Sequence, residues 1–118
     1  MKLYGIQVLV DDYDKARAFY VDTLGLKLEW ELRELGAFGV QVEPVVFIVT
    51  KAGENEGAMG ATPGRFLGVS IAVDDIDAVY RDLSAKGVPF EGSPETQPWG
   101  GTLAYFRDPS GNILTLMA

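Results

Sequence analysis

Apolar and polar residues alternate in two separate stretches of the chain, residues 3–10 and residues 66–73. Alternation with a period of two is typical of a strand that buries one face. The apolar faces consist of Ile6, Val8 and Val10 in the first stretch and of Val69, Ile71 and Val73 in the second. We therefore predict two strands, each with its apolar face against a helix.

The period changes to that of a helix directly after each strand. The helical apolar positions are Ala16, Phe19, Tyr20 and Leu24 after the first strand and Ile76, Val79, Tyr80 and Leu83 after the second. Asp12 and Asp75 stand at the expected N-caps, and Gly25 and Gly87 stand where a left-handed residue ends a helix. The pairs Asp11-Asp12 and Asp74-Asp75 look like catalytic carboxylates, but their position favours capping.

These two units are copies of one pattern. Residues 10–16, Val-Asp-Asp-Tyr-Asp-Lys-Ala, recur as residues 73–79, Val-Asp-Asp-Ile-Asp-Ala-Val, about half a chain length later. Further strands are predicted over residues 27–35, 37–42 and 45–50 in the first half and over 88–91, 102–107 and 113–117 in the second. The glycine-rich segment between the halves predicts a flexible connector, since no Gly-Lys-Ser/Thr phosphate motif follows it. We expect module one at 1–50, the connector at 51–65 and module two at 66–118.

Longer phrases resemble the vicinal oxygen chelate superfamily, which groups glyoxalase I, extradiol dioxygenases, fosfomycin-resistance enzymes and bleomycin-resistance proteins. They are residues 18–26 (AFYVDTLGL), 98–101 (PWGG) and 106–112 (FRDPSGN). The resemblance covers almost the whole chain. It implies a single α+β domain of two βαβββ modules in tandem, forming a curved, mostly antiparallel eight-stranded sheet around a cleft with helices outside. It also implies a homodimer.

Metal-using members of that superfamily hold their ion at four places. These places match Gly5, Gly68, Thr115 and, more loosely, Phe47. None of these residues offers a charged or imidazole side chain, so we expect no metal and no cofactor, and metal-dependent isomerisation or ring cleavage becomes improbable. A displaced site for a hard cation such as Mg²⁺, made from Glu43, Gln7 or Gln41, remains an alternative.

Composition narrows the chemistry further. The 118 residues include no Cys and no His, which excludes disulfides, thiolate or imidazole zinc sites and Ser-His-Asp catalysis. Seventeen acidic against ten basic residues give a net charge of −7, which opposes binding to nucleic acid and favours a cationic small molecule. No apolar run approaches the length of a membrane span, and no secretory signal is evident, so we expect a cytoplasmic protein.

Strand alternation, started from Gly5 and Gly68, predicts the contents of the cleft. The candidate ligand-binding residues are Gln7, Ser70 and Thr115 on its floor and Trp30, Phe38, Phe47, Tyr105 and the loop residue Trp99 on its walls. Other roles stay open: Trp30 suits core or dimer-interface packing, and Gln7 suits a polar group bonded to its neighbours. The motif at residues 108–112 suits a turn.

Three functions follow from this picture. The leading hypothesis is a metal-independent small-molecule-binding protein that resembles bleomycin-resistance proteins and sequesters an apolar or aromatic, possibly cationic ligand. The second is a glyoxalase-type lyase or isomerase that uses Glu43, Tyr105 or another carboxylate or phenol as the base, or an atypical metal site. Proton abstraction by a Glu requires that burial raise its pKa. The third is a regulatory or interaction domain whose cleft stays empty.

Overall fold

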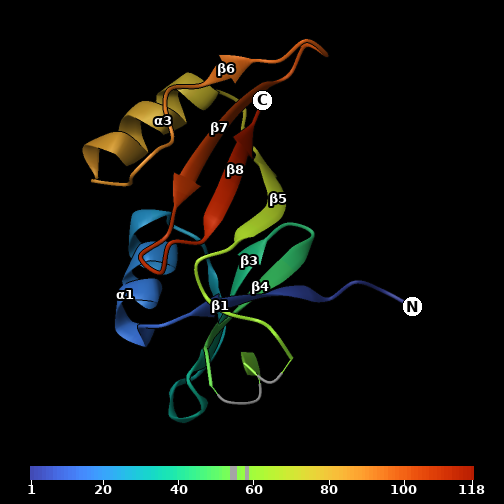
Figure 1. Ribbon diagram of the computed structural model, residues 1–118, viewed down its shortest axis with the longest axis vertical. Coiled ribbons are helices and arrows are strands. Elements are labelled where there is room, and N and C mark those ends of the chain that lie inside the picture. The colour runs from blue at the N-terminus through green and yellow to red at the C-terminus, as the bar shows by residue number, and fades with distance from the viewer. Residues whose placement is uncertain (54–55, 58) are drawn as a thin grey trace.

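The chain forms eight strands in two four-stranded sheets, seen in a computed structural model that describes residues 1–53, 56–57 and 59–118 (Figure 1). The first sheet has the order β1-β4-β3-β2 and the second the order β5-β8-β7-β6. The strands are β1 (Gly5–Val10), β2 (Leu28–Leu32), β3 (Ala37–Val42), β4 (Val45–Lys51), β5 (Phe66–Ala72), β6 (Glu95–Thr96), β7 (Thr102–Arg107) and β8 (Ile113–Met117).

Both sheets have the same connectivity. The first and last strands of each module, β1 with β4 and β5 with β8, pair in parallel, and the remaining neighbours pair antiparallel. The predicted α+β class with tandem modules is therefore confirmed, with the strands of one chain divided between two sheets. Three residues of the predicted connector, 54, 55 and 58, lie outside the described residues.

The helices begin and end where the sequence predicts. α1 (Tyr13–Arg17) continues directly as the π-helix η1 (Ala18–Thr23), and α3 (Ile76–Ala85) is a regular α-helix. The Asp12 side chain accepts a hydrogen bond from the Lys15 backbone N–H at 3.0 Å, and Asp75 accepts one from Ala78 at 3.0 Å. Gly25 and Gly87 have φ of 69° and 87°. Both caps and both terminators are confirmed.

Two predicted strands differ from the structure. The strand over 27–35 is shorter, because Arg33–Leu35 forms the 3₁₀ turn η2. The strand predicted over 88–91 is wrong: this segment runs beside β7 with one bridge, Phe90 to Phe106, and the paired strand is the later β6. Pro89 has no N–H to donate, so only its carbonyl joins the ladder, accepting from the Arg107 N–H at 3.0 Å.

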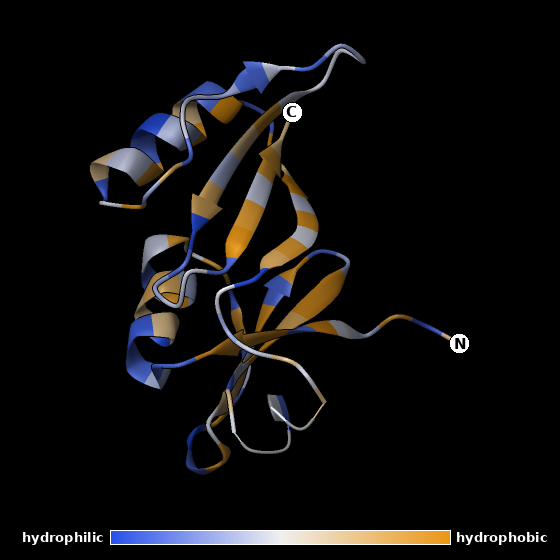
Figure 2. Ribbon diagram, in the orientation of Figure 1, coloured by the Kyte–Doolittle hydropathy of each residue, from blue (hydrophilic) through white to orange (hydrophobic). Residues whose placement is uncertain are grey.

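α1 and α3 lie on the same side of the two sheets, and the core fills the space beneath them (Figure 1). Strands carry most of the apolar residues, whereas the outer helix surfaces are polar (Figure 2). η1 joins the two halves of the core. The Tyr20 ring meets Phe47 of β4 edge to face, with centroids 6.5 Å apart, and the Phe19 centroid lies 6.3 Å from that of Phe106 of β7. None of the helices in the described parts of the chain is long and apolar enough to cross a membrane.

A buried polar network joins the modules. The carboxylate of Asp108, only 4% exposed, accepts a 2.7 Å hydrogen bond from the Tyr20 hydroxyl and bonds from the backbone N–H groups of Ser110 and Asn112. Asn112, 1% exposed, donates from Nδ2 both to Asp108 and to the Leu9 carbonyl at 2.8 Å. We call Tyr20, Asp108 and Asn112 the module clasp.

The clasp also holds the end of the connector. Asn112 Oδ1 accepts from the backbone N–H groups of Gly64 and Arg65 at 3.0 and 3.1 Å. All four hydrogen-bonding positions of this buried amide are therefore used. Removing any member takes a hydrogen-bond partner from a buried polar group, which costs more than one exposed hydrogen bond contributes.

The clasp predicts how stability depends on alkaline pH. Burial, together with Asp108, raises the pKa of Tyr20 well above its usual range, and burial with the Glu31 hydrogen bond raises the pKa of Tyr13 to about 12. Because both folded-state pKa values exceed the unfolded value, this stability is complete below about pH 10 and is lost as pH rises further. We expect Tyr20→Phe to lower the free energy of unfolding by about 1–2 kcal/mol at pH 7.

Tyr20→Phe should also reduce, without abolishing, the fall in unfolding free energy above about pH 10, because Tyr13 still contributes. Urea titrations of both proteins between neutral and alkaline pH measure this. Equal slopes for the two proteins would show that Tyr20 ionises as readily folded as unfolded, contrary to the clasp.

Candidate functional site

The sheet faces that point away from the helices carry most of the predicted site residues, and we call them the open faces. In the second sheet, Ser70, Thr115 and Tyr105 form one row across β5, β8 and β7, because Ser70 pairs with Thr115 and Thr115 pairs with Tyr105. Thr115 is 4% exposed, whereas Ser70 is exposed and Tyr105 half-buried. The structure thus brings together three residues that the sequence nominated separately.

Gln7 and Trp30 lie on the open face of the first sheet. Gln7 is exposed, and its Nε2 donates to the Thr50 hydroxyl at 3.4 Å. The Trp30 indole N–H donates to the Tyr4 hydroxyl at 2.9 Å. Its ring lies flat against β3 at Gly39, where an added β-carbon would come within 2.6 Å of the indole. Only a glycine at this position leaves room for the ring.

Two of the predicted wall residues lie on the other side of their sheet. Phe38 and Phe47, 0% and 1% exposed, lie on the helix side of the first sheet, packed against Tyr13 and Tyr20. The register explains their direction, since Phe47 pairs with Ile6, whose side chain also faces the helix. The run from Val45 to Val49 is apolar on both faces, so its composition alone gave no sign of which residues face the core.

Trp99 lies apart from Trp30. It is 65% exposed in the loop between β6 and β7, at one end of the molecule, whereas Trp30 lies in β2 of the other sheet (Figure 1). The Trp99 ring rests on Gly101, where an added β-carbon would approach it to 2.0 Å. One chain therefore presents the two tryptophans on separate surfaces.

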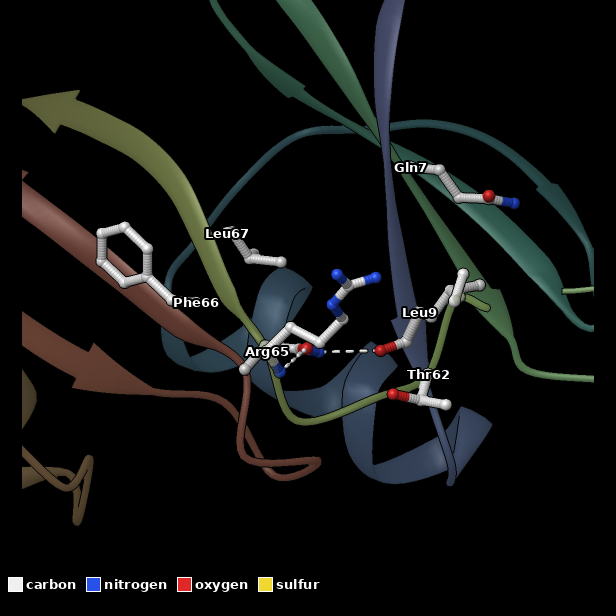
Figure 3. Close-up of a pocket in the computed structure, with 8 residues that line it drawn as sticks. Gln7, Leu9, Thr62, Arg65, Phe66 and Leu67 are labelled. Atoms are coloured by element: carbon white, nitrogen blue, oxygen red, sulfur yellow. Dashed lines mark hydrogen bonds between the residues drawn. The ribbon is translucent and has the colours of Figure 1, made fainter. Parts of the chain in front are cut away.

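Two cavities open where the two sheets meet. The first, about 280 Å³, lies beside the connector (Figure 3) and is lined by Gln7, Leu9, Ala61, Thr62, Arg65, Phe66, Leu67 and Asn112. The Arg65 side chain extends between Leu67 and Leu9 in this view. The second cavity, about 290 Å³, is lined by Glu43, Gly68 and Ser70 and also by Phe47, which reaches it from the helix side. Gln7 and Ser70 thus line different cavities.

Sequence reasoning missed Arg65 and Phe66. Phe66 is 61% exposed, and its ring centroid lies 6.3 Å from that of Tyr105 on the same open face. The even spacing of Phe66, Gly68 and Ser70 along β5 indicates that they share one face, and this was the available signal. Arg65 could not be found from the sequence, because it belongs to the glycine-rich connector and acquires its place only when Asn112 binds its backbone.

The four positions that match metal ligands do not fit a divalent cation. A β-carbon on Gly5 would lie 2.7 Å from the Val46 carbonyl oxygen and 2.9 Å from the Ile48 side chain, so neighbouring atoms already fill the space. Gly68 has a left-handed φ of 70°, which disfavours any side chain. Phe47 points to the opposite face, and Thr115 offers one buried hydroxyl.

The structure does not bring together the residues of the alternative Mg²⁺ site, Glu43, Gln7 and Gln41. Gln7 and Glu43 line different cavities, and Gln41 belongs to β3. Among residues 1–53, 56–57 and 59–118 there is no group of three or more acidic side chains that could hold a metal ion. Oxygen-rich coordination of the kind that Mg²⁺ needs is therefore not assembled in this part of the chain.

Comparison with known proteins decides the family. The sequence profile described as Glyoxalase/Bleomycin resistance protein/Dioxygenase superfamily matches residues 3–116. The chain belongs to this superfamily. A superfamily member from Sphaerobacter thermophilus has a crystal structure that superimposes with a TM-score of 0.87 at 29% identity, covering 99% of this chain and 96% of that one.

Two further relatives carry names that bear on function. A bleomycin resistance protein from Klebsiella pneumoniae is 27% identical, over 90% of this chain and 83% of its own length. TnmS3, an antibiotic binding protein from Streptomyces sp. CB03234, superimposes with a TM-score of 0.80 at 29% identity, covering 98% of this chain and 93% of that one. Within the superfamily, these two relatives are named for antibiotic resistance and antibiotic binding.

The crowding at Gly5 is directly testable. Gly5→Ala should lower the unfolding free energy by about 1–3 kcal/mol, because the new methyl group meets a backbone oxygen that cannot move without disturbing the β1–β4 ladder. Gly57→Ala is the matched control, since no atom lies within 4 Å of its added β-carbon. Urea denaturation measures both. An equally small effect at the two positions would mean that the Gly5 position can accept a side chain.

Proposed function

We propose that this chain is a metal-independent small-molecule-binding protein that sequesters an apolar or aromatic ligand on its open faces. The observation that carries the proposal is the packing at Gly5, where Val46 and Ile48 occupy the space that a ligating side chain would need. A site without ligands for an ion has to bind through shape, stacking and charge.

Exposed aromatic rings supply the contact surface. Tyr4 and Phe66 are 58% and 61% exposed, and each has an aromatic or indole partner, Trp30 and Tyr105 respectively. Rings held in place by a neighbour lose little freedom when a planar ligand stacks on them. The hydrogen bond from Trp30 to Tyr4 orients the indole, which makes this pair the stronger stacking element of the two.

The negative charge of the protein favours a positively charged ligand. The net charge of −7 raises the local concentration of cations around the protein and opposes phosphate-rich partners. Arg65 at the connector cavity adds one positive group beside the apolar Phe66 and Leu67. A ligand with an aromatic body and a positive charge therefore suits the open faces, with its charged end kept away from Arg65.

The names of the Klebsiella pneumoniae and Streptomyces relatives make bleomycin the natural first probe. We expect metal-free bleomycin to quench tryptophan fluorescence saturably, with the same Kd before and after treatment with a chelator. Trp30→Phe should weaken binding about tenfold, which corresponds to about 1.4 kcal/mol of lost stacking.

Tyr80→Phe is the control for that titration, because Tyr80 belongs to α3 on the helix side and contacts Phe90 edge to face. It should leave the Kd unchanged, and thermal melts confirm that both variants fold. Binding that disappears with chelator and returns with a divalent metal would refute the proposal.

We also propose that two chains pair, so that the open face of the first sheet in one protomer meets that of the second sheet in its partner. Exposed aromatic side chains on these faces support the pairing, because such patches mark interaction surfaces. A dimer of this kind brings together surfaces that one chain keeps apart, those of Trp30 and Trp99.

Sedimentation tests the pairing. The protein should sediment with twice its chain mass of 12.8 kDa at concentrations where bleomycin binds. Phe66→Ser should shift the protein toward monomer by about tenfold in dissociation constant, since it removes an apolar ring from the interface. Met59→Ser, at a residue 76% exposed in the connector, should have no effect. A monomer that binds bleomycin fully would contradict the paired site.

A second function has one observation in its favour. Glu43 lines the cavity that also contains Gly68 and Ser70, so a carboxylate lies near the second open face. A glyoxalase-type lyase or isomerase would use it as a base. Turnover of the hemithioacetal of methylglyoxal and glutathione that is lost in Glu43→Gln would favour this function over sequestration.

A further inference from the structure

An apolar hollow lies between the two modules on the helix side, away from the open faces. It has a volume of about 330 Å³ and opens between the end of η1 and α3. Its apolar lining consists of Leu24, Leu26, Ile71, Val73, Val79, Leu83, Phe106 and Leu116. Neither Gln7, Ser70 nor Thr115 contributes to it, so this cavity is separate from the site of the proposed function.

The position of α3 explains why the hollow exists. The Tyr80 ring meets Phe90 edge to face, with centroids 4.8 Å apart, and the Phe90 centroid lies 5.6 Å from that of Phe106 of β7. These aromatic contacts hold the helix over β7. The neighbouring side of the sheet is then only partly covered. Ile71 of β5 and Val73, directly after this strand, stay half-buried although they pack against the core on the helix side.

The lining therefore keeps apolar surface in contact with water. Leu83, Phe106 and Leu116 form a closed base at 5%, 0% and 3% exposure, whereas Leu24, Leu26 and Val79 remain half-buried around it. Covering such surface is favourable by about 25 cal/mol per Å². A compact apolar group that enters the hollow gains this energy without any rearrangement of the strands.

Charged groups stand at the rim. Asp22, at the end of η1, and Asp82, on α3, are exposed and line the cavity together with one cation, Lys86. The Lys86 ammonium lies 3.2 Å from Asp82 and 3.5 Å from the Thr23 carbonyl oxygen. Two carboxylates against one ammonium leave the rim with an excess negative charge, which favours a positive group on a ligand.

We propose that this cavity binds small amphipathic amines, with an aromatic or aliphatic body against Ile71, Val73 and Val79 and the ammonium group between Asp22 and Asp82. The volume is at the lower end of the range for small-molecule sites, which suits a body of one ring and excludes large drugs. The bound amine would bridge η1 of the first module and α3 of the second.

Methyl NMR with phenethylamine as the probe tests the proposal. We expect saturable shifts at the methyl groups of Ile71, Val73 and Val79 and none at Ile48, which lies on the open face of the first sheet. Hydrocinnamate, of similar size but negatively charged, should bind at least about threefold more weakly. Shifts confined to Ile48, or no saturable shift at Ile71, would overturn the proposal.

Variants distinguish the contribution of the apolar lining from that of the charged rim. Val79→Phe fills the hollow and should abolish the shifts at Ile71. Combining Asp22→Asn with Asp82→Asn should weaken phenethylamine about three- to tenfold and remove its advantage over hydrocinnamate. Asp77→Asn, in the first turn of α3, is the matched control and should change nothing. If Val79→Phe does not fold, the paired Asn variant decides alone, and an unchanged preference for the amine would refute the assignment of the rim.

Discussion

The arrangement of the two modules depends on the hydrogen bonds that the buried carboxylate of Asp108 accepts. These bonds come from Tyr20, Ser110 and Asn112, which belong to both modules. A buried charge without such partners is strongly unfavourable, so these hydrogen bonds are what allows the carboxylate to be buried. Because Asn112 also binds the Leu9 carbonyl, β1 and the β7–β8 turn are held together.

This junction decides which surfaces are free. It places η1 over the boundary between the two sheets, on the helix side, where Phe19 and Tyr20 fill the core. The opposite faces of both sheets stay open. The open faces carry hydrogen-bonded or paired rings such as Trp30 and Phe66. Of the four positions that match metal ligands, Gly5, Gly68 and Thr115 belong to these faces, but Gly5 is enclosed by Val46 and Ile48. Binding by shape and stacking is what such a surface still offers.

The repeat made most of the architecture predictable from the sequence. Caps at Asp12 and Asp75 and terminators at Gly25 and Gly87 follow from local rules, because each depends only on residues within one turn. Phe38 illustrates a missed inference: it alternates with Gly39 in β3, and the pattern contained its direction toward the core. Phe47 is different, since the apolar run around it has no alternation to interpret. The role of Asn112 required contacts across the whole chain, which no local pattern contains.

Metal analysis of the purified protein, together with anomalous diffraction from a crystal grown with a bound aromatic cation, tests the central claim most directly. The account predicts no stoichiometric divalent metal and a ligand stacked on Trp30. A full equivalent of metal, with an anomalous peak beside Gly5 or Gly68, would contradict it.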